Sequence, residues 1–200
     1  AKNGLYVISD EVYERLVYDG VKHTCFASLP DAQARTLLVN SFSKSYAMTG
    51  WRIGYLVAPP HIIDQALKAS QYSITNVAAF IQRGAIAALT DPSVEAEVQS
   101  MINHYAQRRQ AVLDTYAEIP ESPIKLSQPD GAFYFFLDAR ALEMLDTEMS
   151  SLLLEEKQVA VVPGSVYGTQ GSGFLRMTTA ADESVIIEGL RRILDWASQR

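Results

Sequence analysis

Residues 41–54 of the chain read Ser-Phe-Ser-Lys-Ser-Tyr-Ala-Met-Thr-Gly-Trp-Arg-Ile-Gly. This stretch places Lys44 among small hydroxyl residues and puts Arg52 a short distance after it. A lysine acts as a covalent catalyst only where a nearby cation or partial desolvation favours its neutral amine. A planar guanidinium is well suited to binding a phosphate. The stretch therefore indicates a Schiff-base lysine next to a phosphate anchor.

Two apolar runs precede this stretch, at residues 5–9 and 36–41. Both are short and rich in β-branched residues, which predicts buried parallel strands. Because ligands of open α/β sheets collect outside the carboxyl ends of the strands, we expect the side chains that follow these runs to meet at one edge. These side chains are Asp10, Tyr13, Ser41 and Lys44.

A carboxylate, a phenol, a hydroxyl and an amine at one edge are the groups that bind pyridoxal phosphate. The carboxylate keeps the ring nitrogen protonated, and the phenol binds the ring oxygen. The amine forms the Schiff base, while hydroxyl groups and a guanidinium hold the phosphate. The pattern therefore favours a pyridoxal phosphate site.

With these motifs in this order, the chain resembles the class I/II aminotransferases of the aspartate aminotransferase superfamily, which are fold-type I pyridoxal phosphate enzymes. The family carries Asp-x-x-Tyr after a strand and Ser-x-Ser-Lys further along, as residues 10–13 and 41–44 do here. Residues 48–55 resemble its phosphate-arginine segment. Three further segments resemble the strands of its small domain: residues 129–134, 161–168 and 174–178.

The resemblance implies an α/β fold in two parts. Residues 1–91 would be the C-terminal portion of the large pyridoxal phosphate-binding domain, a mainly parallel sheet with helices. Residues 92–200 would form a long linking helix and a small α/β domain. We expect further strands at residues 52–57, 132–138, 159–162 and 174–178. We expect helices at residues 61–72, 76–89, 91–116, 147–157 and 182–198.

The resemblance also assigns catalytic roles. Lys44 would form the Schiff base with the cofactor and then carry a proton between the substrate α-carbon and the cofactor. Asp10 would pair with the pyridinium nitrogen and keep the ring an electron sink. Tyr13 would donate a hydrogen bond to the ring oxygen.

The remaining assigned residues would bind the charged ends of cofactor and substrate. Ser41 and Arg52 would bind the cofactor phosphate, with Ser43 as a further candidate. Arg176 would bind the substrate α-carboxylate through both ends of its guanidinium and so orient the substrate.

Metal ligands are not expected. The histidines share no metal-ligand spacing with one another or with the single cysteine, Cys25. Asn76 stands just before an apolar helical pattern, and we expect it to cap that helix.

The composition and net charge limit the classes of partner that this chain is suited to bind. The net charge of −6 and a pI near 5.1 leave no basic stripe, which argues against nucleic acid and anionic lipid as partners. No apolar run approaches the ~20 residues that a membrane helix needs. The N-terminal residues have no signal-peptide pattern, so a cytoplasmic location is the default expectation.

The resemblance implies that this chain is the C-terminal half of a longer protein. The other half would supply a glycine-rich phosphate loop and the ring that stacks on the cofactor. We therefore expect the chain alone to be inactive, to expose apolar surface and to associate. The complete protein would act as a homodimer.

Three functions stay open at this point. The first is an aminotransferase that moves an amino group from an L-amino acid to a 2-oxo acid. The second is a pyridoxal phosphate-dependent carbon–sulfur β-lyase, which turnover that depends on a 2-oxo acid would distinguish. The third is the aminotransferase-like domain of a transcriptional regulator. The identities of the amino donor and acceptor do not follow from these motifs.

Overall fold

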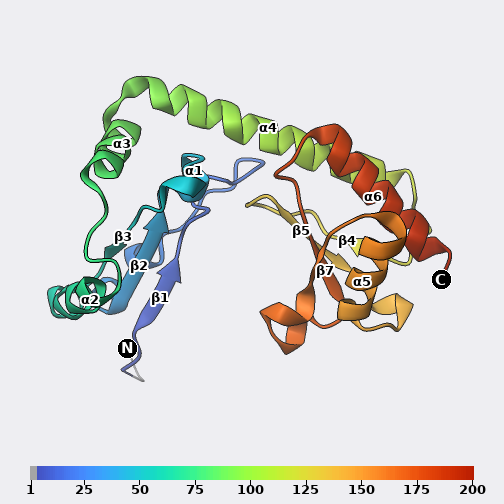
Figure 1. The fold of residues 1–200 in the computed structure, drawn as a ribbon, viewed down its shortest axis with the longest axis horizontal. Coiled ribbons are helices and arrows are strands. Elements are labelled where there is room, and N and C mark those ends of the chain that lie inside the picture. The colour runs from blue at the N-terminus through green and yellow to red at the C-terminus, as the bar shows by residue number, and fades with distance from the viewer. Residues whose placement is uncertain (1–3) are drawn as a thin grey trace. The chain divides into compact units, whose positions relative to one another are not determined.

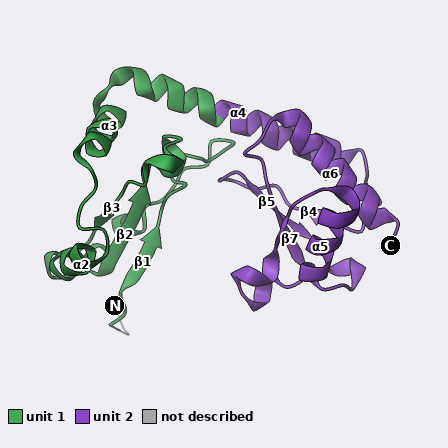
Figure 2. Cartoon of the chain, viewed as in Figure 1, with its two compact units in different colours: residues 1–102 green, residues 103–200 purple. Residues whose placement is uncertain are grey.

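The structure, a computed structural model, describes residues 4–200. It contains two compact units, unit 1 up to Ile102 and unit 2 from Asn103 onward (Figure 2). The division falls within helix α4 (Pro92–Ala117), which contributes residues to both units. The domain boundary expected after residue 91 lies at the start of the same helix and stays a prediction.

Unit 1 contains a three-stranded sheet of β1 (Val7–Asp10), β2 (Thr36–Ser41) and β3 (Gly54–Val57), in that order (Figure 1). The predicted parallel pairing of the first two strands is confirmed, with Asp10 opposite Val39. Strand β3 joins β2 antiparallel, with Gly54 opposite Ser41. The carboxyl ends of β1 and β2 therefore lie at the same edge of the sheet.

The predicted burial of the first strand is wrong. Ile8 is 72% exposed, and Leu5, just before β1, is 68% exposed. These side chains stay open because nothing among residues 4–200 covers them. Unit 1 instead buries a small cluster around Phe42, Met48 and Ala85.

Among the described residues of unit 1, four α-helices begin: α1 (Phe42–Ser45), α2 (Pro60–Ser73), α3 (Ala79–Thr90) and α4. Helix α4 begins as expected, because the Asp91 carboxylate accepts a 2.9 Å hydrogen bond from the Ser93 N–H. The expected capping role of Asn76 is wrong. The residue that precedes α3 is Ala78, and no side chain caps this helix.

Unit 2 is built on a second sheet, of four antiparallel strands in the order β4-β5-β7-β6. They are β4 (Lys125–Leu126), β5 (Tyr134–Asp138), β7 (Phe174–Thr178) and β6 (Val162–Pro163). The two long strands match the prediction. Strand β4 was not predicted, because a two-residue strand is too short to show a periodic pattern.

Helices α5 (Asp146–Lys157) and α6 (Glu183–Ser198) pack with the sheet of unit 2. Alternate residues of the two long strands, such as Leu137 and Leu175, point into this core together with Leu190 of α6. The predicted α/β layer is therefore confirmed. The neighbouring residues of each strand point to the opposite face of the sheet.

Short 3₁₀ helices complete the fold. They span Phe26–Ser28, Gln33–Arg35, Thr49–Trp51, Arg140–Leu142, Gly164–Tyr167 and Thr169–Gly171. None of the helices among the described residues is both long enough and apolar enough to cross a lipid bilayer.

Candidate active site

The carboxyl edge of the first sheet collects most of the residues singled out from the sequence. Asp10 ends β1 beside Val39, and β2 ends two residues later at Ser41. Helix α1 starts at the next residue, which brings Lys44 to the same edge. Tyr13 lies in the turn that follows β1. The expected convergence at one sheet edge is thus present in the fold.

Ser41 and Ser43 form a pair of neighbouring hydroxyl groups. Ser41 caps α1, because its Oγ accepts the Ser43 N–H at 3.1 Å. The two Oγ atoms are 2.9 Å apart, and the Ser41 Oγ also lies 3.1 Å from the Ile53 carbonyl oxygen. The serine pair is therefore held by the turn on one side and by Ile53, the residue before β3, on the other.

The turn between α1 and β3 returns Arg52 to this edge. Ala47 and Arg52 both adopt a left-handed backbone with φ of 53°, a conformation that non-glycine residues rarely adopt outside tight turns. The Arg52 guanidinium is exposed and donates a 2.8 Å hydrogen bond to the Thr49 carbonyl oxygen. Gly54 then pairs with Ser41, where a Cβ atom would lie 2.6 Å from the Asn40 carbonyl oxygen.

Asp10 is an exposed acidic residue at the end of β1. One oxygen of its carboxylate accepts the Val12 N–H at 3.2 Å, and the residue is exposed. Among residues 4–200 it has no cationic partner. Among the described residues, this carboxylate is therefore open to a cationic ligand.

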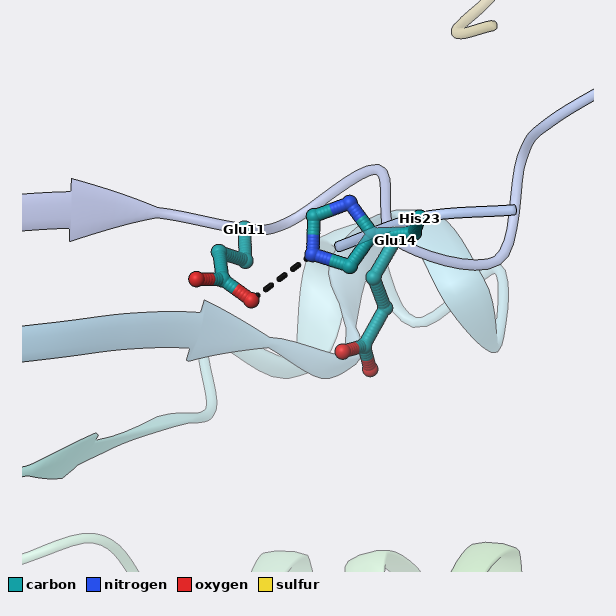
Figure 3. A group of neighbouring side chains, drawn as sticks. All are labelled: Glu11, Glu14 and His23. Carbon is teal, nitrogen blue, oxygen red and sulfur yellow. Dashed lines mark hydrogen bonds and ion pairs between the residues drawn. The ribbon is translucent and has the colours of Figure 1, made fainter. Parts of the chain in front are cut away.

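Glu11, which follows Asp10 in the sequence, forms a hydrogen-bonded pair with His23 (Figure 3). Glu11 is only 4% exposed, and its Oε2 lies 2.7 Å from the His23 Nε2. The other carboxylate oxygen accepts hydrogen bonds from the Phe26 N–H at 2.9 Å and the Ser9 hydroxyl at 3.1 Å. Burial raises the pKa of Glu11, but these hydrogen bonds outweigh it and hold the pKa below its ordinary value. The pair ties the loop after Asp10 to the sheet edge.

The carboxylate of Glu14 lies in the same group, with one ligand atom from each of Glu11, Glu14 and His23 within 4.8 Å of the others (Figure 3). Spacing along the sequence did not reveal this group, because the loop that closes it is long. Within this group the Glu11 carboxylate already accepts three hydrogen bonds, one of them from His23.

Arg176, the expected carboxylate ligand, lies on β7 in unit 2. It stands opposite Phe136 of β5 and Val162 of β6. The central carbon of its guanidinium lies 4.4 Å from the centre of the Tyr134 ring and 5.0 Å from that of Tyr167. The sequence indicated the arginine but not the two tyrosines that contact it.

The chain is similar to known proteins over nearly its whole length. The profile of the family "Aminotransferase class I and II" matches residues 1–193. Aspartate aminotransferase of Pyrococcus horikoshii is 38% identical over 94% of this chain and 47% of its own length. A probable aspartate/prephenate aminotransferase of Aquifex aeolicus is 41% identical over 96% of this chain and 49% of its own length.

Solved structures show the same fold. The crystal structure of an aromatic aminotransferase from Pyrococcus horikoshii superposes with a TM-score of 0.93 at 38% identity, covering 100% of this chain and 52% of that one. The chain spans about half the length of the curated relatives it matches. By the profile match and the shared fold, the chain belongs to the class I and II aminotransferases.

Proposed function

We propose that the complete protein is a pyridoxal phosphate-dependent aminotransferase that moves an amino group from an L-amino acid to a 2-oxo acid. The observation that carries this proposal is the meeting of Asp10, Ser41 and Lys44 at one sheet edge in a chain of this family. The relatives are named for aspartate, aspartate/prephenate and aromatic aminotransferases, which favours transfer over β-elimination or a regulatory domain.

The residues at this edge fit the cofactor. The hydroxyl pair of Ser41 and Ser43 and the exposed guanidinium of Arg52 suit its phosphate. The unpaired carboxylate of Asp10 suits its ring nitrogen. The amine of Lys44 directly follows the serine pair and suits its aldehyde. When bound, pyridoxal phosphate supplies an electron sink for the electron pair that remains when the substrate α-proton leaves.

The protein side chains then position and move protons. Lys44 Nζ would hold the cofactor through its aldehyde, and once substrate takes that place the free amine would take the proton from the substrate α-carbon and pass it to the cofactor. Asp10 would keep the ring nitrogen protonated, and Tyr13 would donate a hydrogen bond to the ring oxygen. Arg176 binds the substrate carboxylate and orients the α-carbon.

The wider expectations belong to the same proposal. Residues 1–91 would form part of the cofactor-binding domain and residues 92–200 the linking helix and small domain. We propose a homodimer as the active form, supported by family membership and by the exposed apolar side chains of unit 1. A cytoplasmic location and inactivity of this chain alone stay predictions.

The lysine can be tested by mixing the chain with pyridoxal phosphate, reducing with borohydride and locating the added mass by peptide mass spectrometry. We expect the mass on the Lys44 peptide, lost in Lys44→Ala and kept in Lys68→Ala, an exposed lysine of α2. The complete protein is then assayed for turnover that depends on a 2-oxo acid. The proposal would be contradicted if the complete protein were labelled on other lysines and not on Lys44. Turnover without a 2-oxo acid would also contradict it.

A further inference from the structure

Arg176 differs from every other arginine of unit 2. Each of the others donates to an oxygen: Arg108 to Thr179, Arg109 to Pro129, Arg140 to Asp138, Arg191 to Glu118, Arg192 to Glu188 and Arg200 to Glu156. For Arg176, residues 4–200 supply no carboxylate and no hydrogen-bond acceptor. Arg176 is a half-buried residue, and a guanidinium without an acceptor is poised to bind an anion.

What contacts Arg176 instead is a pair of aromatic rings. Tyr134 approaches from β5 and Tyr167 from the 3₁₀ helix Gly164–Tyr167. A ring face attracts a cation but provides no oxygen that would neutralise it. The two rings therefore restrict where the guanidinium lies while leaving its charge for a ligand.

Close packing of the backbone positions the Tyr167 ring. A Cβ on Gly164 would lie 2.2 Å from the Gly171 carbonyl oxygen, so glycine is required where these two segments touch. The Tyr167 ring meets the Phe136 ring edge to face, with centroids 6.3 Å apart. Phe136 in turn stacks on Phe174 at 4.9 Å. Phe136 and Phe174 therefore support the Tyr167 ring on the face of the sheet that lies away from the core.

We propose that Tyr134 and Tyr167 are positioning residues that hold the Arg176 guanidinium ready for the substrate carboxylate. The inference rests on the proposed function, because the ligand is the carboxylate shared by amino acids and 2-oxo acids. An arginine side chain has several rotatable bonds, and ordering them on binding costs affinity. Two rings that order the guanidinium beforehand remove part of that cost.

The test measures how tightly the complete protein, with pyridoxal phosphate bound, binds succinate and 3-phenylpropionate. Both probes carry a carboxylate and no amino group, and titration of the cofactor absorbance gives their dissociation constants. The variants are Tyr134→Leu and Tyr167→Leu, with the ring-conserving Tyr134→Phe and Tyr167→Phe. Tyr72→Leu is the control, because Tyr72 is 94% exposed.

We expect each leucine variant to weaken binding roughly two- to fivefold, whereas the phenylalanine variants bind nearly as the parent does. In an Arg176→Ala background, which itself loses most of the affinity, the leucine substitutions should have no further effect. This dependence on Arg176 separates positioning from a general structural defect. Tyr167 is 53% exposed, so its leucine variant leaves the core intact if Tyr134→Leu does not fold.

The outcomes are distinguishable. If Arg176→Ala loses the probes but the leucine variants bind them normally, the positioning role is wrong and the carboxylate site stands. If the leucine variants weaken binding equally with and without Arg176, the rings do not act through the arginine and the inference is likewise overturned. If Arg176→Ala binds both probes as the parent does, the carboxylate role of Arg176 in the proposed function fails, and the inference fails with it.

Discussion

Glu11 directly follows Asp10, the residue proposed to bind the cofactor ring nitrogen, and it anchors the loop that begins there. Its buried carboxylate accepts hydrogen bonds from His23, the Phe26 N–H and Ser9. Burial alone would raise its pKa, but the hydrogen bonds lower it below the ordinary value of the unfolded chain. The folded state therefore binds fewer protons than the unfolded state between those two pKa values.

The pH dependence of stability follows from this difference. The contribution of Glu11 is fully present above its ordinary pKa and is lost as the pH falls through its folded pKa. We expect Glu11→Gln to lower the free energy of unfolding at pH 7 by about 1–3 kcal/mol, because a charged acceptor of three hydrogen bonds is replaced. We also expect the variant to lose less stability than the parent between pH 7 and pH 3.

Urea unfolding at several pH values measures both effects. Glu97→Gln is the matched control, since Glu97 is exposed on α4. Identical pH profiles for Glu11→Gln and the parent would show that the Glu11 carboxylate does not stabilise the fold.

Strands β2 and β3 position the serine pair and the turn that carries Arg52. Gly54 begins β3 opposite Ser41, and a Cβ there would lie 2.6 Å from the Asn40 carbonyl oxygen. Because the obstructing atom belongs to the backbone of the neighbouring strand, a side chain can be accommodated only if the strands separate. The residue type at this position is therefore set by the approach of the two strands.

We expect Gly54→Ala to destabilise unit 1 by about 1–3 kcal/mol, the usual cost of an overpacked site. The separated strands should also reduce borohydride-trapped labelling of Lys44 by pyridoxal phosphate. Gly50→Ala is the control in the same turn, because a Cβ there meets nothing within 4 Å. Equal stability and equal labelling of the two variants would contradict this reading of the β2–β3 contact.

The strands and helices differ in how well the sequence predicts them. The run at residues 36–41 was predicted with the bounds that β2 shows, because a short apolar run that ends in polar residues is typical of a strand. Asn76 was wrongly expected to cap a helix, because α3 starts at Ala79 and leaves Asn76 in the preceding loop. A capping residue has a local signal, but packing decides where the helix starts.

The two units of the molecule have cores of unequal size. Unit 2 buries a large cluster in which Leu190, Leu175 and Leu137 are fully buried, whereas the cluster of unit 1 is built around Phe42 and Met48. Burial of apolar area is the main favourable contribution to folding, so the units should differ in stability. Unfolding of this chain is then not a single two-state step.

We expect urea to unfold unit 1 first, and hydrogen exchange to show stronger protection in β5, β7 and α6. Leu190→Ala should lower the stability of unit 2 by about 2–5 kcal/mol and leave the first transition unchanged. Val185→Ala on the same helix is the control, because Val185 is 62% exposed. A single transition reported alike by probes in both units would rule out independent unfolding.

The sequence was sufficient for the features that depend on neighbours along the chain. The order of the motifs and the strands that lead to Asp10 and Lys44 follow from local spacing. Parallel pairing of two such strands then brings their polar carboxyl ends to one edge, because parallel strands run in the same direction. Ligands of such sheets bind at this edge.

Other features required the folded chain. Glu11 meets His23 across a loop, and the rings that contact Arg176 come from two other segments of unit 2. The exposure of Ile8 depends on what covers the sheet, not on the composition of the strand. These contacts join residues that are far apart in the sequence. A local pattern of residues does not predict which distant segments pack together.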